Sequence, residues 1–598
     1  MNKIITERLK LFQMKDLKRT HYSTQLSADN IGERVCVMGW VQKMRNLGSI
    51  IFIDLRDRSG IIQLALGDHS DREVFERAAK LKSEFVIGVL GNVKSRGADI
   101  NKDKKTGEIE IDVDDIIIYG EAVTPPFEID DQQNVNEELR LKYRYLDLRR
   151  PSLTSNIIFR HNVQRLTREY FYDNGFIDIE TPNLIKPTPE GARDYLVPSR
   201  VHKGKFYVLP QSPQIYKQIL MVAGFDRYIQ LAKCYRDEDL RADRQPEFTQ
   251  VDLEMSFVDE DEIFEIIEGY MKTLFSKLIC VDIETPIAKM SYDECMSKYG
   301  TDKPDLRYGY EIYDLTNIAK SSSFRLFSEA NAVKGIKIDE DFSRKEIDSL
   351  TEYVKTYKAK GLAWYKNTAP PTSSYAKFLT DEENKKIFDQ FELGPNETIF
   401  IIADTDPDVV ATALGALRCE IAKRKNKIPK DVFKLLWVTD FPMFEYGEDD
   451  GRWYAKHHPF TQPNPDELDK YLESDPSKIH ARAYDLVING WEAGGGSIRI
   501  NKPEMQQRIL KFLGYEEEVA KERFGFLMDS YKYGAPQHGG IAFGLERLVC
   551  LLLGLTNIRD VIAFPKVQNA SELMSGAPSF ADEKALEELG IAVIKQKE

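Results

Sequence analysis

This sequence contains few cysteines and no long apolar run. Its six cysteines, among 598 residues, lie far apart and form no Cys-x-x-Cys pair, which argues against a cysteine-ligated metal. No apolar run reaches about 18 residues, so we expect no membrane-spanning helix. The opening "MNKIITERLKLFQMKDLKRT" lacks the apolar middle and the cleavage site of a secretory signal. We therefore expect a reduced, cytoplasmic protein with no membrane partner.

Positive charge is also in deficit. The net charge is −14, which argues against a general nucleic-acid binder. Residues 1–60 nevertheless hold 11 Lys+Arg against 6 Asp+Glu, so selective contact with a structured RNA stays open beside a mixed solvated surface. The apolar content of 42% is ordinary for a globular protein, and the length suggests about four domains.

Short stretches of alternating apolar and polar residues fill residues 33–120. Three predicted strands come first, in "ERVCVMGWVQKM", "SIIFIDLRD" and "GIIQLALG", and two follow in "EFVIGVLGNVKS" and "EIEIDVDDIIIYG". Between the two groups, residues 70–84 predict a helix whose apolar face carries Val74, Phe75, Ala78 and Leu81. This order is that of a five-stranded OB barrel, a fold that binds oligonucleotides on its sheet face.

Three side chains of the predicted barrel suit unpaired bases. Arg45, Phe52 and Gln63 lie on or beside its first strands, where arginines and aromatic rings can clamp and stack bases. Because Ile51 and Ile53 flank Phe52, its ring could equally belong to the core.

The stretch "CYRDEDLRADRQPEFTQ" (234–250) is unusually charged. Residues 228–236 and 247–257 predict two antiparallel strands, and the loop Asp237–Pro246 between them carries four acids and two arginines. A solvated hairpin tip is one interpretation. Arg236 and Phe248 at the strand ends favour another, because arginine binds phosphate and an aromatic ring can stack on a purine.

Six motifs point to a family. The segments "FIDIETP" (176–182), "YRDED…RQPEFTQVDLE" (235–254) and "GGIAFGLERL" (539–548) resemble the three signature motifs of class II aminoacyl-tRNA synthetases. The segments "TPEGARDYLVPSR" (188–200), "QSPQIYKQ" (211–218) and "INGWEAGGGSIRI" (488–500) resemble those of the bacterial-type aspartyl-tRNA synthetases. The resemblance covers the chain after about the first 20 residues.

The resemblance implies an α+β multidomain fold. Its parts are an N-terminal five-stranded OB β-barrel, a catalytic domain with an antiparallel sheet and flanking helices, and an inserted α+β domain without assignable chemistry. The expected boundaries are 1–20 for an extension, 21–124 for the anticodon-binding barrel, 125–150 for a hinge, 151–305 and 430–598 for the two catalytic parts, and 306–429 for the insertion. The amphipathic segment 155–176 predicts a long helix at the start of the first catalytic part.

The resemblance also implies a two-step reaction with ATP and Mg²⁺ as cofactors. L-aspartate is activated to aspartyl-adenylate with release of pyrophosphate, and it is then transferred to the 3′ end of tRNA(Asp) by a homodimer in which Pro182 ends the interface motif. The implied nucleotide contacts are Arg236, Asp237, Glu238, Gln245, Phe248, Glu492, Gly544, Leu545, Glu546 and Arg547. Among these, Arg236, Glu492 and Arg547 would carry catalysis. Asp485 and Glu492 would hold Mg²⁺ together with substrate phosphates.

Recognition of aspartate requires cationic donors. Arg499, after three glycines, is the expected planar fork, and Lys217 is the second donor. We expect asparagine to leave both cations uncompensated. The implied aspartate contacts are Glu190, Gln214, Lys217, Arg236, His457 and Arg499, with Asp252 and His458 nearby.

The sequence leaves three alternative functions to be weighed. A relaxed form would also charge tRNA(Asn), although Leu47 in the barrel loop resembles the strict form. Lysyl and asparaginyl relatives share the three signature motifs but are disfavoured by residues 188–200 and by the long insertion. A non-catalytic RNA-binding paralogue is disfavoured because Arg236, Glu492, Arg499 and Arg547 are all present.

Overall fold

The structure is a computed structural model that describes residues 18–187 and 191–594. Its chain divides into two compact units, Met1–Phe159 with Arg559–Ser579, and Arg160–Ile558 with Phe580–Glu598. No helix in the described part of the chain is long and apolar enough to cross a membrane.

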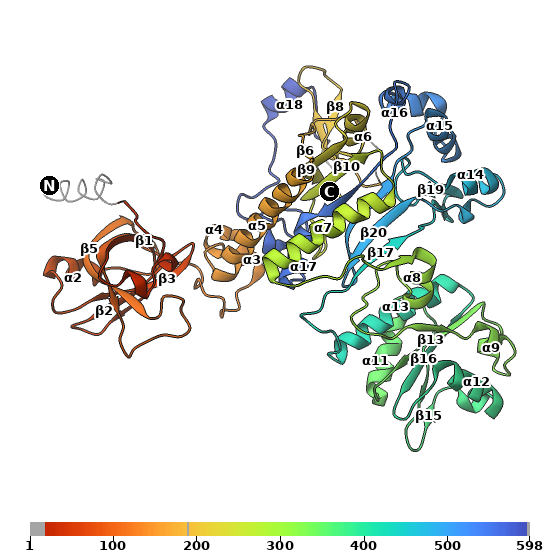
Figure 1. Ribbon diagram of the computed structural model, residues 1–598, viewed down its shortest axis with the longest axis horizontal. Coiled ribbons are helices and arrows are strands. Elements are labelled where there is room, and N and C mark those ends of the chain that lie inside the picture. The colour runs from red at the N-terminus through yellow and green to blue at the C-terminus, as the bar shows by residue number, and fades with distance from the viewer. Residues whose placement is uncertain (1–17, 188–190, 595–598) are drawn as a thin grey trace. The chain divides into compact units, whose positions relative to one another are not determined.

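The first unit contains the expected OB barrel. Its strands β1 (Arg34–Asn46), β2 (Ile51–Asp57), β3 (Gly60–Leu66), β4 (Val86–Ser95) and β5 (Ile109–Gly120) close in the order β1-β2-β3-β5-β4 (Figure 1). Helix α2 (Arg72–Ala78) lies between β3 and β4 and is capped by Asp71. Two short helices, α3 (Glu137–Lys142) and α4 (Arg144–Asp147), occupy the predicted hinge.

Alternation along the barrel strands fills the interior. On β2, Ile51 and Ile53 are fully buried, whereas Phe52 between them is only partly buried. Period-two geometry places these neighbours on opposite faces of the sheet. The ring of Phe52 therefore belongs to the outer face of the barrel and not to its core, which resolves the alternative left open by the sequence.

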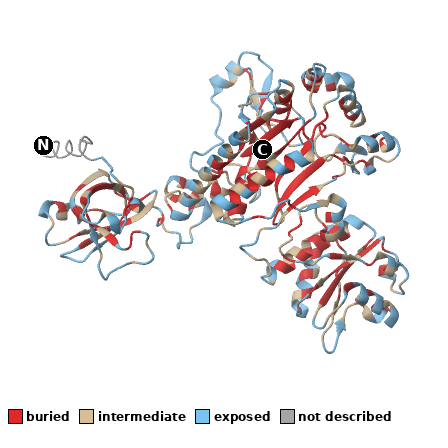
Figure 2. Ribbon diagram, in the orientation of Figure 1, coloured by how far each residue is buried: buried red, intermediate tan, exposed pale blue. Residues whose placement is uncertain are grey.

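The second unit is built on an eight-stranded sheet with the order β11-β17-β20-β21-β22-β10-β9-β6. Its strands are β6 (Ile177–Asp178), β9 (Arg227–Tyr235), β10 (Glu247–Ser256), β11 (Lys289–Ser291), β17 (Leu435–Thr439), β20 (Ala483–Ile488), β21 (Trp491–Ile498) and β22 (His538–Gly544). All neighbours are antiparallel except β6 with β9 and β11 with β17. Buried residues concentrate on these strands (Figure 2). The predicted antiparallel sheet is confirmed.

Helices flank this sheet. The longest are α5 (Pro151–Asp173) and α7 (Glu260–Ile279), and α7 packs on the sheet through Phe264, whose ring stacks on Trp437 at 4.2 Å. The others are α6 (Gln214–Val222), α8 (Tyr292–Tyr299), α14 (Pro465–Tyr471), α15 (Pro503–Phe512), α16 (Glu517–Tyr531), α17 (Leu545–Leu553) and α18 (Glu583–Leu589). Two small hairpins complete the unit, β7 (Leu196–Pro198) with β8 (Phe206–Val208), and β18 (Phe444–Gly447) with β19 (Arg452–Ala455).

Residues 306–429 form a separate five-stranded sheet within this unit. Its order is β12 (Ile312–Asp314), β13 (Ala332–Ile338), β16 (Thr398–Asp404), β14 (Ala363–Lys366) and β15 (Thr372–Ser373). Hydrophobic clusters cover both faces of the sheet. The covering helices are α9 (Thr316–Lys320), α10 (Arg325–Ser328), α11 (Arg344–Lys355), α12 (Asp381–Phe391) and α13 (Pro407–Arg424).

Strand β10 departs from the expected one-sided pattern. Alternation predicts a polar face in contact with water, but Asp252 and Glu254 are as fully buried as Val251 and Leu253. The strand ends at Ser256, and Phe257 beyond it is 76% exposed. Cationic side chains from other elements, Lys217 and Arg499, cover this polar face.

Candidate active site

A cavity of about 840 Å³ lies over β10, β21 and β22. Most of the residues that the sequence suggested line it: Gln214, Lys217, Arg236, Glu238, Gln245, Phe248, Asp252, His457, His458, Asp485, Glu492, Arg499, Gly544, Glu546 and Arg547. Asp237 and Leu545 are not among the lining residues, and Glu190 lies outside the described residues.

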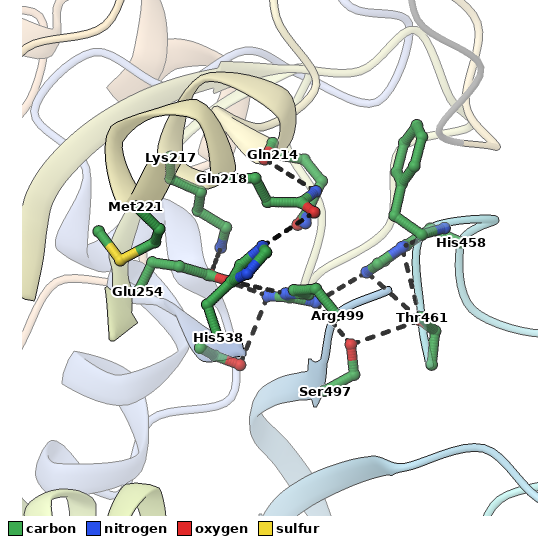
Figure 3. Close-up of polar contacts among 12 residues, drawn as sticks. Gln214, Lys217, Gln218, Met221, Glu254, His458, Thr461, Ser497, Arg499 and His538 are labelled. Atoms are coloured by element: carbon green, nitrogen blue, oxygen red, sulfur yellow. Dashed lines mark hydrogen bonds and ion pairs between the residues drawn. The ribbon is translucent and has the colours of Figure 1, made fainter. Parts of the chain in front are cut away.

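The buried end of the cavity is a cluster of alternating charges (Figure 3). The Nζ atom of Lys217, on α6, lies 2.6 Å from Oδ1 of Asp252 and 3.4 Å from Oε2 of Glu254. The guanidinium of Arg499 donates to Glu254 through Nε at 2.9 Å and through Nη2 at 3.1 Å. Both cations are therefore paired with acids of the protein itself, and their contact with a substrate carboxylate stays a prediction.

The pKa values of the two carboxyl groups in this cluster are shifted in opposite directions. Burial raises the pKa of Asp252 above its usual range, although Lys217 opposes the shift. For Glu254, burial also acts to raise the pKa, but Arg499 and Lys217 outweigh it and lower the value. Glu254 was missed in the sequence, where the signal was its place two residues after Asp252 on the same face of the strand.

Several buried polar atoms in the cavity have no hydrogen-bond partner within the described part of the protein. They are Nε2 of Gln214, Nε of Arg236, Oδ2 of Asp252 and Nε2 of His457. Buried polar groups are nearly always satisfied in native proteins, so such a concentration calls for a ligand or water. Since two of the four are donors and one is an acceptor, the group can hold a molecule with both anionic and cationic ends.

Arg236 and Phe248 lie together at the base of the charged loop. The backbone N–H of Arg236 donates to Pro246, whereas Phe248 pairs with Cys234, so the two side chains are diagonal and not directly opposite. The guanidinium carbon lies 5.2 Å from the centre of the ring. This arrangement presents a cation and an aromatic ring to the same part of the cavity.

The charged loop is partly held by ion pairs. Arg244 lies 3.2 Å from Glu238, and Asp243 lies 3.6 Å from Arg547, which is in the first turn of α17. Glu546, by contrast, is buried: its carboxylate accepts hydrogen bonds from the Thr249 N–H and from Arg160. It anchors α17 to β10.

Two acids meet beyond this loop. A Cβ atom on Gly495 would lie 2.6 Å from Oδ1 of Asp485 and 3.6 Å from Oε1 of Glu492, so both carboxylates converge above this glycine. Burial and the charge of Glu492 raise the pKa of Asp485 well above its usual range. Burial alone would raise the pKa of Glu492 too, but Lys303, whose Nζ is 2.6 Å away, lowers it.

The convergent acids suit a magnesium ion that completes its shell with substrate. Nowhere in residues 18–187 and 191–594 do three or more His, Cys, Asp or Glu side chains form a metal cage. Mg²⁺ is usually held by one or two carboxylates, with phosphates and water filling the other positions. The pair Asp485 and Glu492 fits this pattern.

Two of the three consecutive glycines of β21 are packed closely against the neighbouring strand. A Cβ on Gly494 would lie 2.5 Å from the Phe543 ring, and one on Gly496 would lie 2.1 Å from the carbonyl oxygen of Gly540. Only Gly495 faces the two acids. All three glycines nevertheless line the cavity.

The adjacent histidines have different surroundings. His457 packs edge-on against Phe441, and burial lowers its pKa to about 4. Nε2 of His458 lies 2.8 Å from Nη1 of Arg499. Burial lowers the pKa of His458 well below the usual value. Both rings are neutral at pH 7, and His458 acts as an acceptor for Arg499 at this position.

The outer face of the barrel brings its three predicted contacts together. The guanidinium carbon of Arg45 lies 5.6 Å from the centre of the Phe52 ring, and Nη2 of Arg45 donates to Gln63 at 3.1 Å. Gln63 in turn donates to Glu110 at 2.8 Å. Leu47, in the neighbouring loop, is 70% exposed.

Lys303 is the most informative residue that the sequence did not suggest. It lies in the loop after α8, far from the signature motifs, and no local pattern distinguishes it from a surface lysine. Only the folded chain brings it to Glu492. Pro182, expected at a dimer interface, is exposed just beyond β6 at the edge of the sheet.

Comparisons with known proteins agree with the geometry. The profile of the family described as tRNA synthetases class II (D, K and N) matches residues 136–568, and that of the OB-fold nucleic acid binding domain matches residues 35–119. The aspartate–tRNA ligase of Ruminiclostridium cellulolyticum is 53% identical over 97% of this chain and 99% of its own. The aspartate–tRNA(Asp/Asn) ligase of Caldanaerobacter subterraneus is 51% identical over the same shares.

Solved structures share the fold. A putative aspartyl-tRNA synthetase from Leishmania major superposes with a TM-score of 0.59 at 20% identity, over 94% of this chain and 98% of its own. Asparaginyl-tRNA synthetase from Pyrococcus horikoshii, complexed with asparaginyl-adenylate, gives 0.57 at 19% identity, over 92% and 98%. The chain belongs to the class II tRNA synthetases, and within them to the bacterial-type aspartyl-tRNA synthetases.

Proposed function

We propose that this chain is an aspartate–tRNA ligase. It activates L-aspartate with ATP to give aspartyl-adenylate and pyrophosphate, and it then transfers aspartate to the 3′ end of tRNA(Asp). The observation that carries the proposal is the set of unpaired buried atoms on Gln214, Arg236, Asp252 and His457 in one cavity. An amino acid has carboxylate acceptors and ammonium donors that satisfy such a set.

Activation needs no general base from the protein. The α-carboxylate of aspartate attacks the α-phosphorus, a new P–O bond forms, and the bond to the β-phosphate oxygen breaks as pyrophosphate leaves. Arg236 holds the carboxylate and the α-phosphate in line, and Phe248 stacks on adenine. Arg547 pairs with the departing phosphates. Mg²⁺, when held by Asp485 and Glu492, supplies further positive charge to the phosphates.

The hydrogen-bond donors of Arg499 and Lys217 distinguish aspartate from asparagine. Arg499 and Lys217 carry only N–H groups and accept no hydrogen bond. Lys217 donates a hydrogen bond to Asp252 and forms a longer ion pair with Glu254, and an ammonium has three N–H donors, so donor capacity is left for a substrate. A side-chain carboxylate accepts from such donors, whereas the amide NH₂ of asparagine would be left unpaired in a buried site. Sites that leave buried polar groups unpaired reject the wrong substrate by several powers of ten.

Aminoacylation of purified transcripts tests the proposed function and its nearest alternative together. The chain is expected to charge tRNA(Asp) with aspartate and to charge no tRNA with asparagine. Strict specificity predicts little charging of tRNA(Asn), because Leu47 resembles the strict form, although several relatives are named aspartate–tRNA(Asp/Asn) ligases. Equal charging of both transcripts with aspartate establishes the relaxed form, and no aspartate-dependent charging rejects the proposal.

The barrel is proposed to read the anticodon. Replacing Phe52 by alanine removes a stacking surface whose loss costs about 1 to 3 kcal/mol per base. We expect the KM for tRNA(Asp) to rise at least about fivefold while tRNA-independent ATP–pyrophosphate exchange stays unchanged. Tyr119→Ala, on strand β5 of the same barrel, is a matched aromatic control. A fall in exchange for Phe52→Ala would place the ring in some other role.

We further propose a cytoplasmic homodimer. Ile177 and Leu184, on either side of Pro182 in the sequence, are about half exposed. Ile177 belongs to β6, the strand at the edge of the sheet. Exposed apolar residues along a sheet edge favour association with a second copy. All six cysteines are free thiols, which suits a reducing compartment.

A further inference from the structure

Lys303 occupies the phosphate end of the cavity without a role in the reaction as proposed above. Its ammonium lies 2.6 Å from Oε2 of Glu492, one of the two acids that suit Mg²⁺. Asp302 beside it also lines the cavity. A magnesium ion held at this site would use the same carboxylate, so Lys303 and the metal ion would share one partner.

The loop that carries Lys303 is fixed at its start by close backbone packing. Gly300 ends α8 with φ of 66°, and a Cβ there would lie 2.0 Å from the carbonyl oxygen of Ala411 on α13. The approach is equally close from the other side. A Cβ on Gly415, one turn further along α13, would lie 2.7 Å from the carbonyl oxygen of Gly300. Side chains at these two glycines would force the loop away from the inserted domain.

The end of the loop is held by a buried arginine. Arg418 on α13 is fully buried and donates to the carbonyl oxygens of Asp305, Tyr308, Gly309 and Tyr310, at 3.0 to 3.4 Å. Its guanidinium carbon lies 4.8 Å from the ring centres of both Tyr299 and Tyr308. A buried cation that makes so many backbone hydrogen bonds fixes the path of the segment it contacts.

The same loop also contacts the strands that carry the two acids. Gly490 forms the turn between β20 and β21, and a Cβ on it would lie 3.0 Å from Cβ of Asp305. Lys303 therefore lies between two fixed points, α13 of the inserted domain and the β20–β21 turn.

We propose that the Lys303 ammonium and a divalent cation compete for Glu492, and that Lys303 turns to the polyphosphate when ATP and the metal bind. The inserted domain positions it through Arg418 and the 300–310 loop. The four-carbon stem of lysine permits this movement while the backbone stays in place. The inference rests on the proposed function, because it takes Asp485 and Glu492 as the metal acids.

Binding of Mn²⁺ to the ATP-free protein tests the proposal directly, with free Mn²⁺ followed by electron paramagnetic resonance. Lys303→Met removes the competing cation, so Mn²⁺ affinity is expected to rise about tenfold, while the KM for ATP rises at least about tenfold. Lys303→Arg retains the cation, so its Mn²⁺ affinity should stay near that of the unmodified protein. Lys456→Met removes a cation from the same cavity that contacts Tyr292 and not Glu492, and is expected to change Mn²⁺ affinity less than about threefold.

Unchanged or weaker Mn²⁺ binding by Lys303→Met would overturn the proposal, as would an equal gain in Lys456→Met. Neither result would affect the proposed function, which is judged by aspartate-dependent charging in the unmodified chain. The two failures are therefore distinguishable.

The role of the inserted domain is tested by Arg418→Lys in two backgrounds. Lysine cannot reach four carbonyl oxygens, so the loop loosens and Mn²⁺ affinity is expected to rise about threefold when Lys303 is present. In the Lys303→Met background the same change should have no effect, since the residue that it positions is gone. Equal effects in both backgrounds would mean that Arg418 does not act through Lys303. If Arg418→Lys does not fold, as thermal unfolding will show, Tyr308→Leu is measured in its place.

Discussion

Replacing Arg236 by glutamine is expected to lower aspartate-dependent ATP–pyrophosphate exchange by about 10²- to 10³-fold. A fixed cationic donor aimed at developing charge in a buried site is worth about 2.7 to 4 kcal/mol. Nε of Arg236 has no partner in the described protein, and its guanidinium covers Phe248. The variant therefore loses the group that holds the phosphate and the carboxylate in line.

Arg241→Gln is the matched control for this prediction. It removes an arginine from the same loop, but Arg241 is exposed and does not line the cavity. Exchange should stay within about twofold of the unmodified chain. Equal losses in both variants would assign the effect to loop charge in general and would contradict the role of Arg236.

Replacing Arg499 by leucine is expected to abolish exchange with aspartate and also to destabilise the protein. Arg499 is buried and its fork holds Glu254, which has no exposure at all. Removing one partner of a buried ion pair leaves the other charge uncompensated, at a cost of about 3 kcal/mol or more. Lys217, at 3.4 Å from Glu254, relieves part of this cost.

A double variant separates the loss of activity from the loss of stability. Arg499→Met combined with Glu254→Met replaces the pair by apolar side chains, which often restores stability. We expect thermal unfolding to recover toward that of the unmodified protein while exchange stays absent. If exchange by either variant remained within about tenfold, or about 1.4 kcal/mol, Arg499 would not bind the substrate carboxylate.

The sequence predicted the parts of the site whose residues are close together in the chain. Arg236 and Phe248 belong to one hairpin, and hairpin pairing places both on the same face. Arg547 follows a glycine at the start of an apolar helix, and the structure begins α17 at Leu545 as expected. The barrel order was also visible, because period-two alternation survives within single strands.

The parts that the sequence did not predict depend on distant elements. Glu254 has the alternation of a solvated residue, and its charge is compensated by Lys217 from α6 and by Arg499, just beyond β21. Lys303 and Glu492, which form an ion pair, are 189 positions apart in the sequence. A pattern within one segment carries no information on such contacts, since the partner charge lies elsewhere in the chain.

A crystal structure with a sulfamoyl analogue of aspartyl-adenylate tests the central claim most directly. The account predicts that Nε of Arg236 and Nε2 of Gln214 lie within about 3.2 Å of ligand oxygen atoms. It also predicts that the side-chain carboxylate accepts from Arg499 and Lys217, and that adenine lies against Phe248. An analogue that binds outside this cavity, or one that leaves Arg236 and Gln214 unpaired, would contradict the account.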